Sequence, residues 1–182
     1  MKYEEKTVDR KQIYNGNIIN VERLTVTLPN GKEATRDLVL HPGASVVIPI
    51  GNDGCIYMVR QYRKPIEKVS LELPAGKLDP GEDPEVCARR ELKEETGLSA
   101  GIFKHLISIH TTPGFSNEVL HLYAAAELQE GDAHTDEDEF LTTEKVKIGD
   151  LINLILNHEI TDAKTIIGIF LAEKILNGEI KL

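Results

Sequence analysis

Three glutamates that lie close together in the chain, Glu91, Glu94 and Glu95, have the residue type and the spacing of a metal-binding group. Positions i, i+3 and i+4 lie on one face of an α-helix, so the three carboxylates would be neighbours. Neighbouring carboxylates repel one another, and a hard divalent cation such as Mg²⁺ removes that repulsion because it prefers oxygen ligands. A motif of this kind on its own is more often a solvated acidic helix face, so the surrounding residues decide between the two interpretations.

The residues that flank these glutamates predict the helix that must position them. Asp83 followed by Pro84 is typical of an N-cap and the first helical position, and Gly81 before them is typical of a turn. Gly97 is a natural helix stop, because glycine readily adopts the left-handed conformation that often follows the last turn. We therefore expect a helix between Asp83 and Gly97 that presents the glutamates on one side.

The expected helix lies within a longer stretch, residues 76–98, which reads GKLDPGEDPEVCARRELKEETGL. This stretch resembles the Nudix box, in which a glycine, five residues, a glutamate and seven residues precede a segment like RELKEETGL. The residues at the fixed positions of the box are Gly76, Glu82, Arg90, Glu91, Leu92, Glu94, Glu95, Gly97 and Leu98. The resemblance implies a Nudix hydrolase, which uses a divalent metal to cleave a nucleoside diphosphate linked to another moiety.

The resemblance also implies roles for individual residues. It implies Mg²⁺ as the metal, with Mn²⁺ as an alternative, and as metal ligands the carboxylates of Glu91, Glu94 and Glu95 and the carbonyl of Ala75. Glu95 would also be a catalytic residue. Arg90 and Glu82 would form an ion pair that orients the metal-binding carboxylates.

Two segments outside the box resemble the ADP-ribose pyrophosphatase branch of the same family. One is residues 72–76, ELPAG, and the other is residues 110–118, HTTPGFSNE, in which Pro113 lies 16 residues after Gly97. A Pro-Gly pair by itself indicates only a turn. Together the two segments imply ADP-ribose as the substrate, with Glu72, Pro113 and Gly114 among the residues that bind it.

The segment 60–65, RQYRKP, is basic in an acidic chain. On its own it is equally an exposed strand end, but the same branch has a similar element whose arginine reaches the substrate. Arg63 is therefore our candidate for a phosphate clamp, because a guanidinium can bind phosphate oxygens in a bidentate way. Arg36 resembles another arginine of the branch, which in relatives contacts substrate across a dimer interface. Relatives stack adenine on an aromatic side chain near this arginine, where the present sequence has Ile18 and Ile19, with Tyr14 close by.

An acidic segment, residues 131–139 (GDAHTDEDE), is by itself most simply a solvated charge run. In the Nudix family, a carboxylate from such a loop acts as general base or orients the attacking water. The resemblance therefore implies Glu139 or Glu137 in this role, with Asp138 as a third alternative. A carboxylate of ordinary basicity suffices beside a metal ion, because the metal lowers the pKa of bound water.

The whole chain of 182 residues is long enough for one core with a small accessory unit. Its net charge of −9 argues against binding to nucleic acid or to an anionic membrane, and no apolar run approaches the length of a membrane span. The N-terminus is too charged for a signal peptide, and the two cysteines lack metal-ligand spacing. We therefore expect a cytoplasmic protein, in which an anionic substrate needs a locally basic pocket or a bridging metal.

The remaining patterns predict a small antiparallel β unit, residues 1–41, and a Nudix domain, residues 42–182. In the first unit, an alternating strand over residues 21–28 is followed by a Pro-Asn-Gly turn and a return strand over residues 32–41. We expect this unit to contact substrate and to pair with a second copy in a homodimer, as Nudix relatives with such an extension commonly do. In the second unit we expect an α/β/α sandwich with a mixed sheet. Its strands are expected over residues 44–50, 55–62, 69–73, 102–110 and 118–126, and its further helices over residues 150–157 and 162–176.

The sequence leads to the hypothesis of Mg²⁺-dependent hydrolysis of the pyrophosphate of ADP-ribose to AMP and ribose 5-phosphate. Alternatives in the same class are a broader action on nucleoside diphosphate sugars, such as GDP-mannose or ADP-glucose, or on dinucleoside polyphosphates. An alternative of another class is a module that senses ADP-ribose without cleaving it, which the complete set of box carboxylates disfavours.

Overall fold

The computed structural model describes residues 2–133 and 140–182. The chain divides into two units. The larger contains Ala44–Ile109 and Leu120–Leu182, and the smaller contains the residues up to Gly43 together with His110–Val119. Within the described part of the chain, no helix is long and apolar enough to cross a membrane.

Strand β4 (Ala44–Pro49) lies inside a four-stranded sheet of the larger unit, and each of its residues is buried. It pairs in parallel with β9 (Val119–Glu130) and antiparallel with β7 (Ala75–Lys77), so the sheet is mixed. Strand β8 (Leu98–His110) forms the edge next to β9. A second, antiparallel sheet has the order β10 (Leu141–Lys147), β5 (Cys55–Arg63), β6 (Lys68–Glu72), with a 3₁₀ turn η1 (Lys64–Ile66) between β5 and β6.

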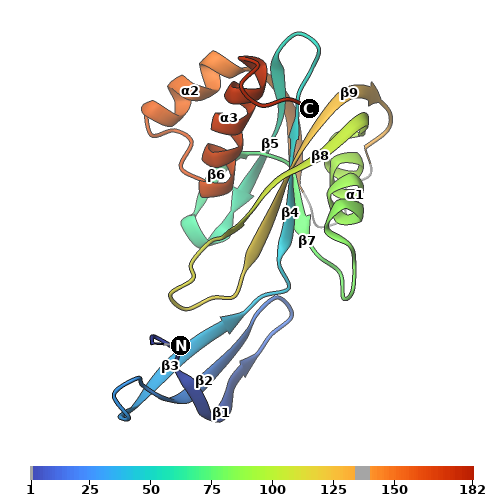
Figure 1. Cartoon of the computed structure of the whole chain (residues 1–182). Helices are drawn as coiled ribbons and strands as arrows, with labels where there is room; N and C mark the ends of the chain where they lie inside the picture. The colour runs from blue at the N-terminus through green and yellow to red at the C-terminus, as the bar shows by residue number, and fades with distance from the viewer. Residues whose placement is uncertain (1, 134–139) are drawn as a thin grey trace. The chain divides into compact units, whose positions relative to one another are not determined.

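The two faces of β4 pack against different helices, because successive side chains of a strand point to opposite faces. Val46 and Ile48 belong to an apolar core that includes side chains of α2 (Ile148–Leu156) and α3 (Ala163–Leu176). Val47 belongs to a second cluster that includes side chains of α1 (Pro84–Thr96). In the larger unit, α1 therefore lies on one side of the sheet and α2 and α3 on the other (Figure 1). The expected α/β/α sandwich with a mixed sheet is confirmed.

The smaller unit is an antiparallel sheet in the order β1 (Lys6–Asn15), β2 (Asn20–Thr27), β3 (Glu33–Leu40). The predicted hairpin between β2 and β3 is present. The N–H of Gly31 donates to the carbonyl of Leu28 at 2.9 Å, and the φ of +83° at this glycine is one that side-chain-bearing residues rarely adopt. The segment 110–119 is attached to β3, since the N–H of Val39 donates to the carbonyl of Phe115 at 2.7 Å.

The sequence patterns do not predict strands β1, β7 and β10. Every residue of β1 is exposed, so the strand has no alternation of buried and exposed positions that would reveal it. Strand β7 has only three residues, one of which is a glycine. Strand β10 is polar and is defined by its pairing with β5, which begins with Leu141 opposite Gln61. Each of these strands depends on a partner strand rather than on local pattern.

Candidate active site

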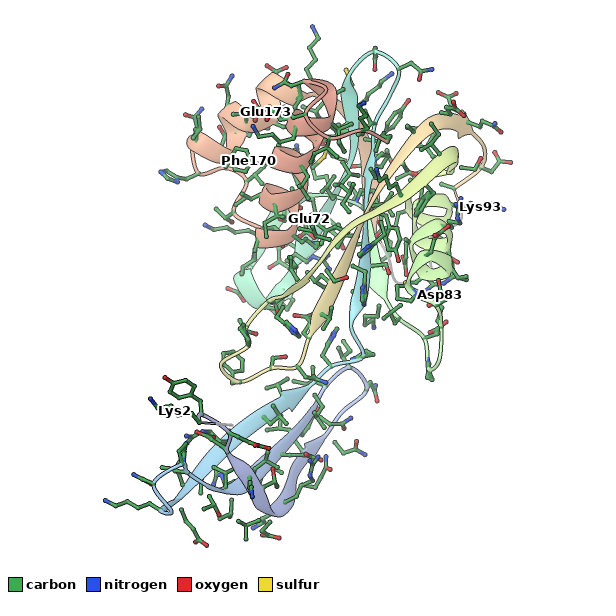
Figure 2. All side chains as sticks on the ribbon, in the orientation of Figure 1. Lys2, Glu72, Asp83, Lys93, Phe170 and Glu173 are labelled. Carbon is green, nitrogen blue, oxygen red and sulfur yellow. The ribbon has the colours of Figure 1, made fainter. Side chains whose placement is uncertain are left out.

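Helix α1 carries the three glutamates of the box and is fixed at both ends by local sequence. At its start, the Asp83 side chain accepts hydrogen bonds from the N–H groups of Glu85 and Val86, at 2.9 and 3.4 Å. Such an N-cap stabilises a helix by about 1 kcal/mol. At its end, Gly97 has a φ of +71° and donates its N–H to the carbonyl of Lys93 at 2.9 Å. Asp83 and Lys93 lie toward opposite ends of the helix (Figure 2).

The buried carboxylate of Glu91 lies directly against the backbone of Gly76 in β7. A Cβ atom at Gly76 would be 1.7 Å from Oε1 of Glu91 and 1.9 Å from its Cδ, so a side chain there would displace this carboxylate. Gly76 does not have a positive φ. The glycine of the box therefore lets a box glutamate approach the backbone closely, and its backbone conformation does not call for glycine.

Glu95, also buried, is tied to the same short strand. Its Oε2 accepts a hydrogen bond from the N–H of Ala75 at 3.0 Å. Strand β7 thus contacts two of the three box glutamates, and it pairs in turn with the buried strand β4. The hydroxyl of Ser45 in β4 donates to the carbonyl of Pro84 at 2.7 Å, which attaches the start of α1 to that same strand. The helix and the sheet therefore position these carboxylates together.

The guanidinium of Arg90 lies among the box carboxylates and contacts three of them. Its Nε and Nη2 each donate to an oxygen of Glu82 at 3.0 Å. Its Nη1 donates to Glu91 at 2.7 Å and to Glu94 at 3.0 Å. Hydrogen bonds from Arg90 lower the pKa of Glu82 to about 2, and the bond to Glu82 is the main cause that raises the pKa of Arg90. Both groups are therefore charged near neutral pH.

The oxygen atoms of this group suit a hard divalent cation. Glu91 and Glu95 are buried against β7, whereas the side chain of Glu94 is 39% exposed and faces solvent. Within residues 2–133 and 140–182, however, no three His, Cys, Asp or Glu side chains converge in an arrangement that could hold a metal ion. Nη1 of Arg90 hydrogen-bonds both Glu91 and Glu94. A cation would have to share these two carboxylates with Arg90, which keeps its bidentate contact with Glu82.

A second charged group lies at the end of β6, where the side chain of Glu72 is only 3% exposed. Both of its oxygens accept hydrogen bonds from Arg63, Oε1 from Nε at 2.9 Å and Oε2 from Nη2 at 2.7 Å. Burial raises the pKa of Glu72, but the hydrogen bonds and the positive charges of Arg63 and Lys164 outweigh that effect and lower it to about 2. Glu95 also acts electrostatically on Arg63, which links this group to the box. Two residues predicted to bind substrate are thus bound to each other.

Helix α3 completes this group with residues that sequence analysis missed. The ammonium Nζ of Lys164 lies 2.5 Å from Oε2 of Glu72 and 2.9 Å from Oδ2 of Asp162. Asp162 also caps the helix by accepting from the N–H of Thr165, whose buried hydroxyl accepts from the N–H of Leu73; both distances are 3.0 Å. Glu72 lies inside the larger unit close to α3 (Figure 2). Because 92 residues separate Glu72 from Lys164, no local pattern indicates the pair.

Three of the predicted substrate-binding residues belong to the smaller unit. Arg36 on β3 donates through Nη2 to Oε1 of Glu5 at 2.6 Å. Pro113 and Gly114 are exposed in the segment 110–119, and a Cβ at Gly114 would meet no atom within 4 Å. The predicted water-orienting carboxylates lie outside the described residues: Glu137, Asp138 and Glu139.

The chain with this arrangement of box helix and sheet can be assigned to a known protein family. The family profile described as NUDIX domain matches residues 39–167. The chain belongs to the Nudix family. The resemblance of the box is thereby confirmed, and this Nudix chain is a hydrolase of a family that generally needs a divalent metal. A second profile, described as nucleoside diphosphate sugar hydrolase N-terminal domain, matches residues 5–39.

Two relatives match this Nudix hydrolase along most of their length. The methanol dehydrogenase activator of Bacillus methanolicus is 46% identical over 169 residues, which are 92% of this chain and 91% of the relative. The ADP-ribose pyrophosphatase of Bacillus subtilis (strain 168) is 44% identical over 164 residues, 89% of each chain. A solved structure of an ADP compounds hydrolase matches with a TM-score of 0.86 over 98% of this chain and 97% of that chain. Its sequence identity of 22% supports the shared fold alone.

Proposed function

We propose that this Nudix hydrolase cleaves the pyrophosphate of ADP-ribose to AMP and ribose 5-phosphate, with Mg²⁺ as its metal and Mn²⁺ as an alternative. The observation that carries the proposal is the guanidinium of Arg63, which buried Glu72 holds within the electrostatic reach of Glu95. A fixed cation beside carboxylates that suit a metal favours a ligand with two linked phosphates. The identity of 44% with the ADP-ribose pyrophosphatase of Bacillus subtilis, over 89% of both chains, favours ADP-ribose among such ligands.

The residues of the box would hold the metal: Glu91, Glu94 and Glu95, with the carbonyl of Ala75. When bound, the metal supplies neutralisation of the diphosphate charge and activation of water. Arg90 restrains two of these carboxylates through Nη1, while its Nε and Nη2 remain on Glu82. Glu82 thereby keeps the guanidinium in place, so that the carboxylates are oriented before a ligand arrives.

Arg63 would donate to a diphosphate oxygen through Nη1, because its Nε and Nη2 already donate to Glu72. Its side chain is 41% exposed although its partner is buried, so part of the guanidinium faces solvent. Glu139 or Glu137, with Asp138 as an alternative, would orient the attacking water. Further contacts to the substrate would come from Arg36, Pro113 and Gly114.

We also propose a homodimer built through residues 1–41 and a cytoplasmic location. The exposed apolar side chains of Val8 and Ile13 on β1 support pairing with a second copy, because a small isolated sheet buries little apolar surface. The free thiols of Cys55 and Cys87 support a reducing compartment. Light scattering of the purified chain tests the dimer, and a variant without residues 1–41 should be monomeric if they form the interface.

Two alternatives make different predictions. A broad hydrolase of nucleoside diphosphate sugars or dinucleoside polyphosphates would turn over GDP-mannose and ADP-glucose as fast as ADP-ribose. The identity of 46% with a protein named as a methanol dehydrogenase activator favours a second candidate, in which the chain acts on another enzyme. Activation of a methanol dehydrogenase without release of AMP from free ADP-ribose would support that candidate.

The test is product analysis after incubation with ADP-ribose and Mg²⁺ in ¹⁸O-labelled water. We expect AMP and ribose 5-phosphate in equal amounts, with the label in one of them, and we expect EDTA to stop the release and added Mg²⁺ to restore it. Glu95→Gln should lose most of the turnover, and turnover within a few-fold of the wild type would refute Glu95 as a metal ligand. Cleavage of GDP-mannose without cleavage of ADP-ribose would refute the proposed substrate.

A further inference from the structure

Lys164, in the first turn of α3, is almost buried in an ion pair with Glu72. The lysine side chain is 12% exposed, and its Nζ lies 2.5 Å from Oε2 of Glu72. The same oxygen accepts a hydrogen bond from Nη2 of Arg63 at 2.7 Å. We propose that Lys164 is a positioning residue, which offsets part of the negative charge of Glu72 and so leaves the positive charge of Arg63 available to an anionic diphosphate. The inference rests on the proposed function, because that function gives Arg63 its ligand.

The formal charges of this group balance only when the lysine is present. Arg63 and Lys164 are cationic, and Glu72 and Asp162 are anionic, with Lys164 in contact with both carboxylates. Without the lysine the group would carry a net negative charge, and Arg63 would be the one cation facing Glu72, Asp162 and Glu95, which all act on it electrostatically. A diphosphate would then be repelled in a region where burial reduces screening by water. Lys164 should therefore strengthen binding of an anionic substrate.

A purely structural role for the lysine is already filled by its neighbours. Thr165 accepts the hydrogen bond from the N–H of Leu73, which attaches α3 to the end of β6. Asp162 caps the helix through the N–H of Thr165. The helix start is thus held to the strand without Lys164. The lysine adds a positive charge beside the carboxylate of Glu72, which burial would otherwise destabilise.

The test compares Lys164→Met, which removes the charge at similar side-chain length, with Lys164→Arg, which keeps it. For Lys164→Met we expect the KM for ADP-ribose to rise about tenfold, on the scale of one charge-assisted hydrogen bond. We expect kcat to stay unchanged, because the contact from Arg63 binds substrate and transition state alike. Lys164→Arg should restore the KM. The matched control is Lys174→Met on the same helix, whose ammonium pairs with Glu179 at 2.9 Å in an exposed ion pair and should not affect KM.

A double variant separates the charge of Lys164 from its packing. Lys164→Met combined with Asp162→Asn removes one charge of each sign, and asparagine still serves as an N-cap. The KM of the double variant should therefore be close to that of the wild type. A KM of the double variant as high as that of Lys164→Met would overturn the proposal. A fall in kcat and Tm for Lys164→Met without a change in KM would do the same, because it would indicate a structural role only.

A calorimetric titration with inorganic pyrophosphate in the presence of Mg²⁺ gives a readout that does not depend on turnover. We expect Kd to be about tenfold weaker for Lys164→Met than for the wild type. If the wild type releases no AMP from ADP-ribose, the proposed function fails, and this titration still decides the role of Lys164. Equal Kd values, or no binding by either protein, would overturn the inference.

Discussion

Gly76 and Glu91 are in contact so close that a Cβ on the glycine would lie 1.7 Å from the carboxylate oxygen and would displace it. The contact joins β7 to the helix that carries the box, and the N–H of Ala75 makes a second link, to Glu95. This strand of three residues therefore supports two of the three box glutamates. Disturbing the strand should disturb metal binding before it disturbs the fold.

Gly76→Ala should displace the carboxylate of Glu91 and weaken the affinity for metal by about 10- to 100-fold, as loss of a supporting contact typically does. The measurement is the dependence of AMP release on Mg²⁺ concentration, with thermal unfolding measured in parallel. Gly149→Ala is the control, because a Cβ at Gly149 would meet no atom within 4 Å. An unchanged Mg²⁺ dependence in Gly76→Ala would mean that Glu91 does not bind the metal.

Arg90→Lys keeps the positive charge but cannot make the fork of hydrogen bonds to Glu82 while also reaching Glu91. We expect kcat/KM to fall by about 10- to 100-fold, because the metal-binding carboxylates lose their orientation. The neighbouring Arg89 pairs with Glu85 at 2.8 Å in an exposed ion pair, so Arg89→Lys should behave like the wild type. Equal activity of the two variants would show that Arg90 contributes only its charge.

Acid should destabilise the fold as the pH falls from about 4.5 to about 2. Glu72 and Glu82 each have a pKa of about 2 in the folded chain, compared with 4.5 for an ordinary glutamate. A carboxylate whose pKa is lowered by folding stabilises the fold above its unfolded pKa, and this contribution disappears as the pH approaches the folded value. Urea unfolding across this range tests the prediction. Glu72→Gln should reduce the free energy of unfolding at neutral pH and weaken its pH dependence, and an unaltered dependence would contradict the prediction.

Thr165→Val should lower the free energy of unfolding by about 1–3 kcal/mol, because it leaves the N–H of Leu73 without its hydrogen-bond acceptor. The threonine is fully buried, and its hydroxyl accepts that bond at 3.0 Å. Thr165→Ser is the matched control, because it keeps the hydroxyl and removes only the methyl group. Urea unfolding at neutral pH measures both variants. A greater loss for serine than for valine would mean that packing, not the hydrogen bond, holds the helix to the strand.

The helix of the box could be predicted from the sequence because each of its determinants is local. Asp83 caps its start and Gly97 ends it in the left-handed conformation, as their residue types indicate. The hairpin between β2 and β3 could be predicted for the same reason, through the turn at Gly31. Strand β1 could not, because its exposed residues carry no alternating pattern and it is defined by pairing with β2.

The group around Glu72 shows the limit of prediction from local pattern. A resemblance to relatives indicated Arg63 and Glu72 separately as substrate-binding residues. The structure adds that they form an ion pair and that Lys164, from a helix 92 residues later, binds the same carboxylate. The three side chains come from β5, β6 and α3, and only the folded chain brings them together. Sequence patterns predict elements well where neighbours in the chain determine them.

Helix α3 contains no residue of the box, yet its first turn is attached to the strand that leads into it. A chain shortened before Asp162 would lose the acceptor for the N–H of Leu73 and one of the two counter-ions of Glu72. Minimal versions of this enzyme for crystallisation or protein engineering should therefore retain the whole C-terminal helix. Affinity tags and surface linkers are better joined after Leu182, which is 39% exposed and distant in sequence from these contacts.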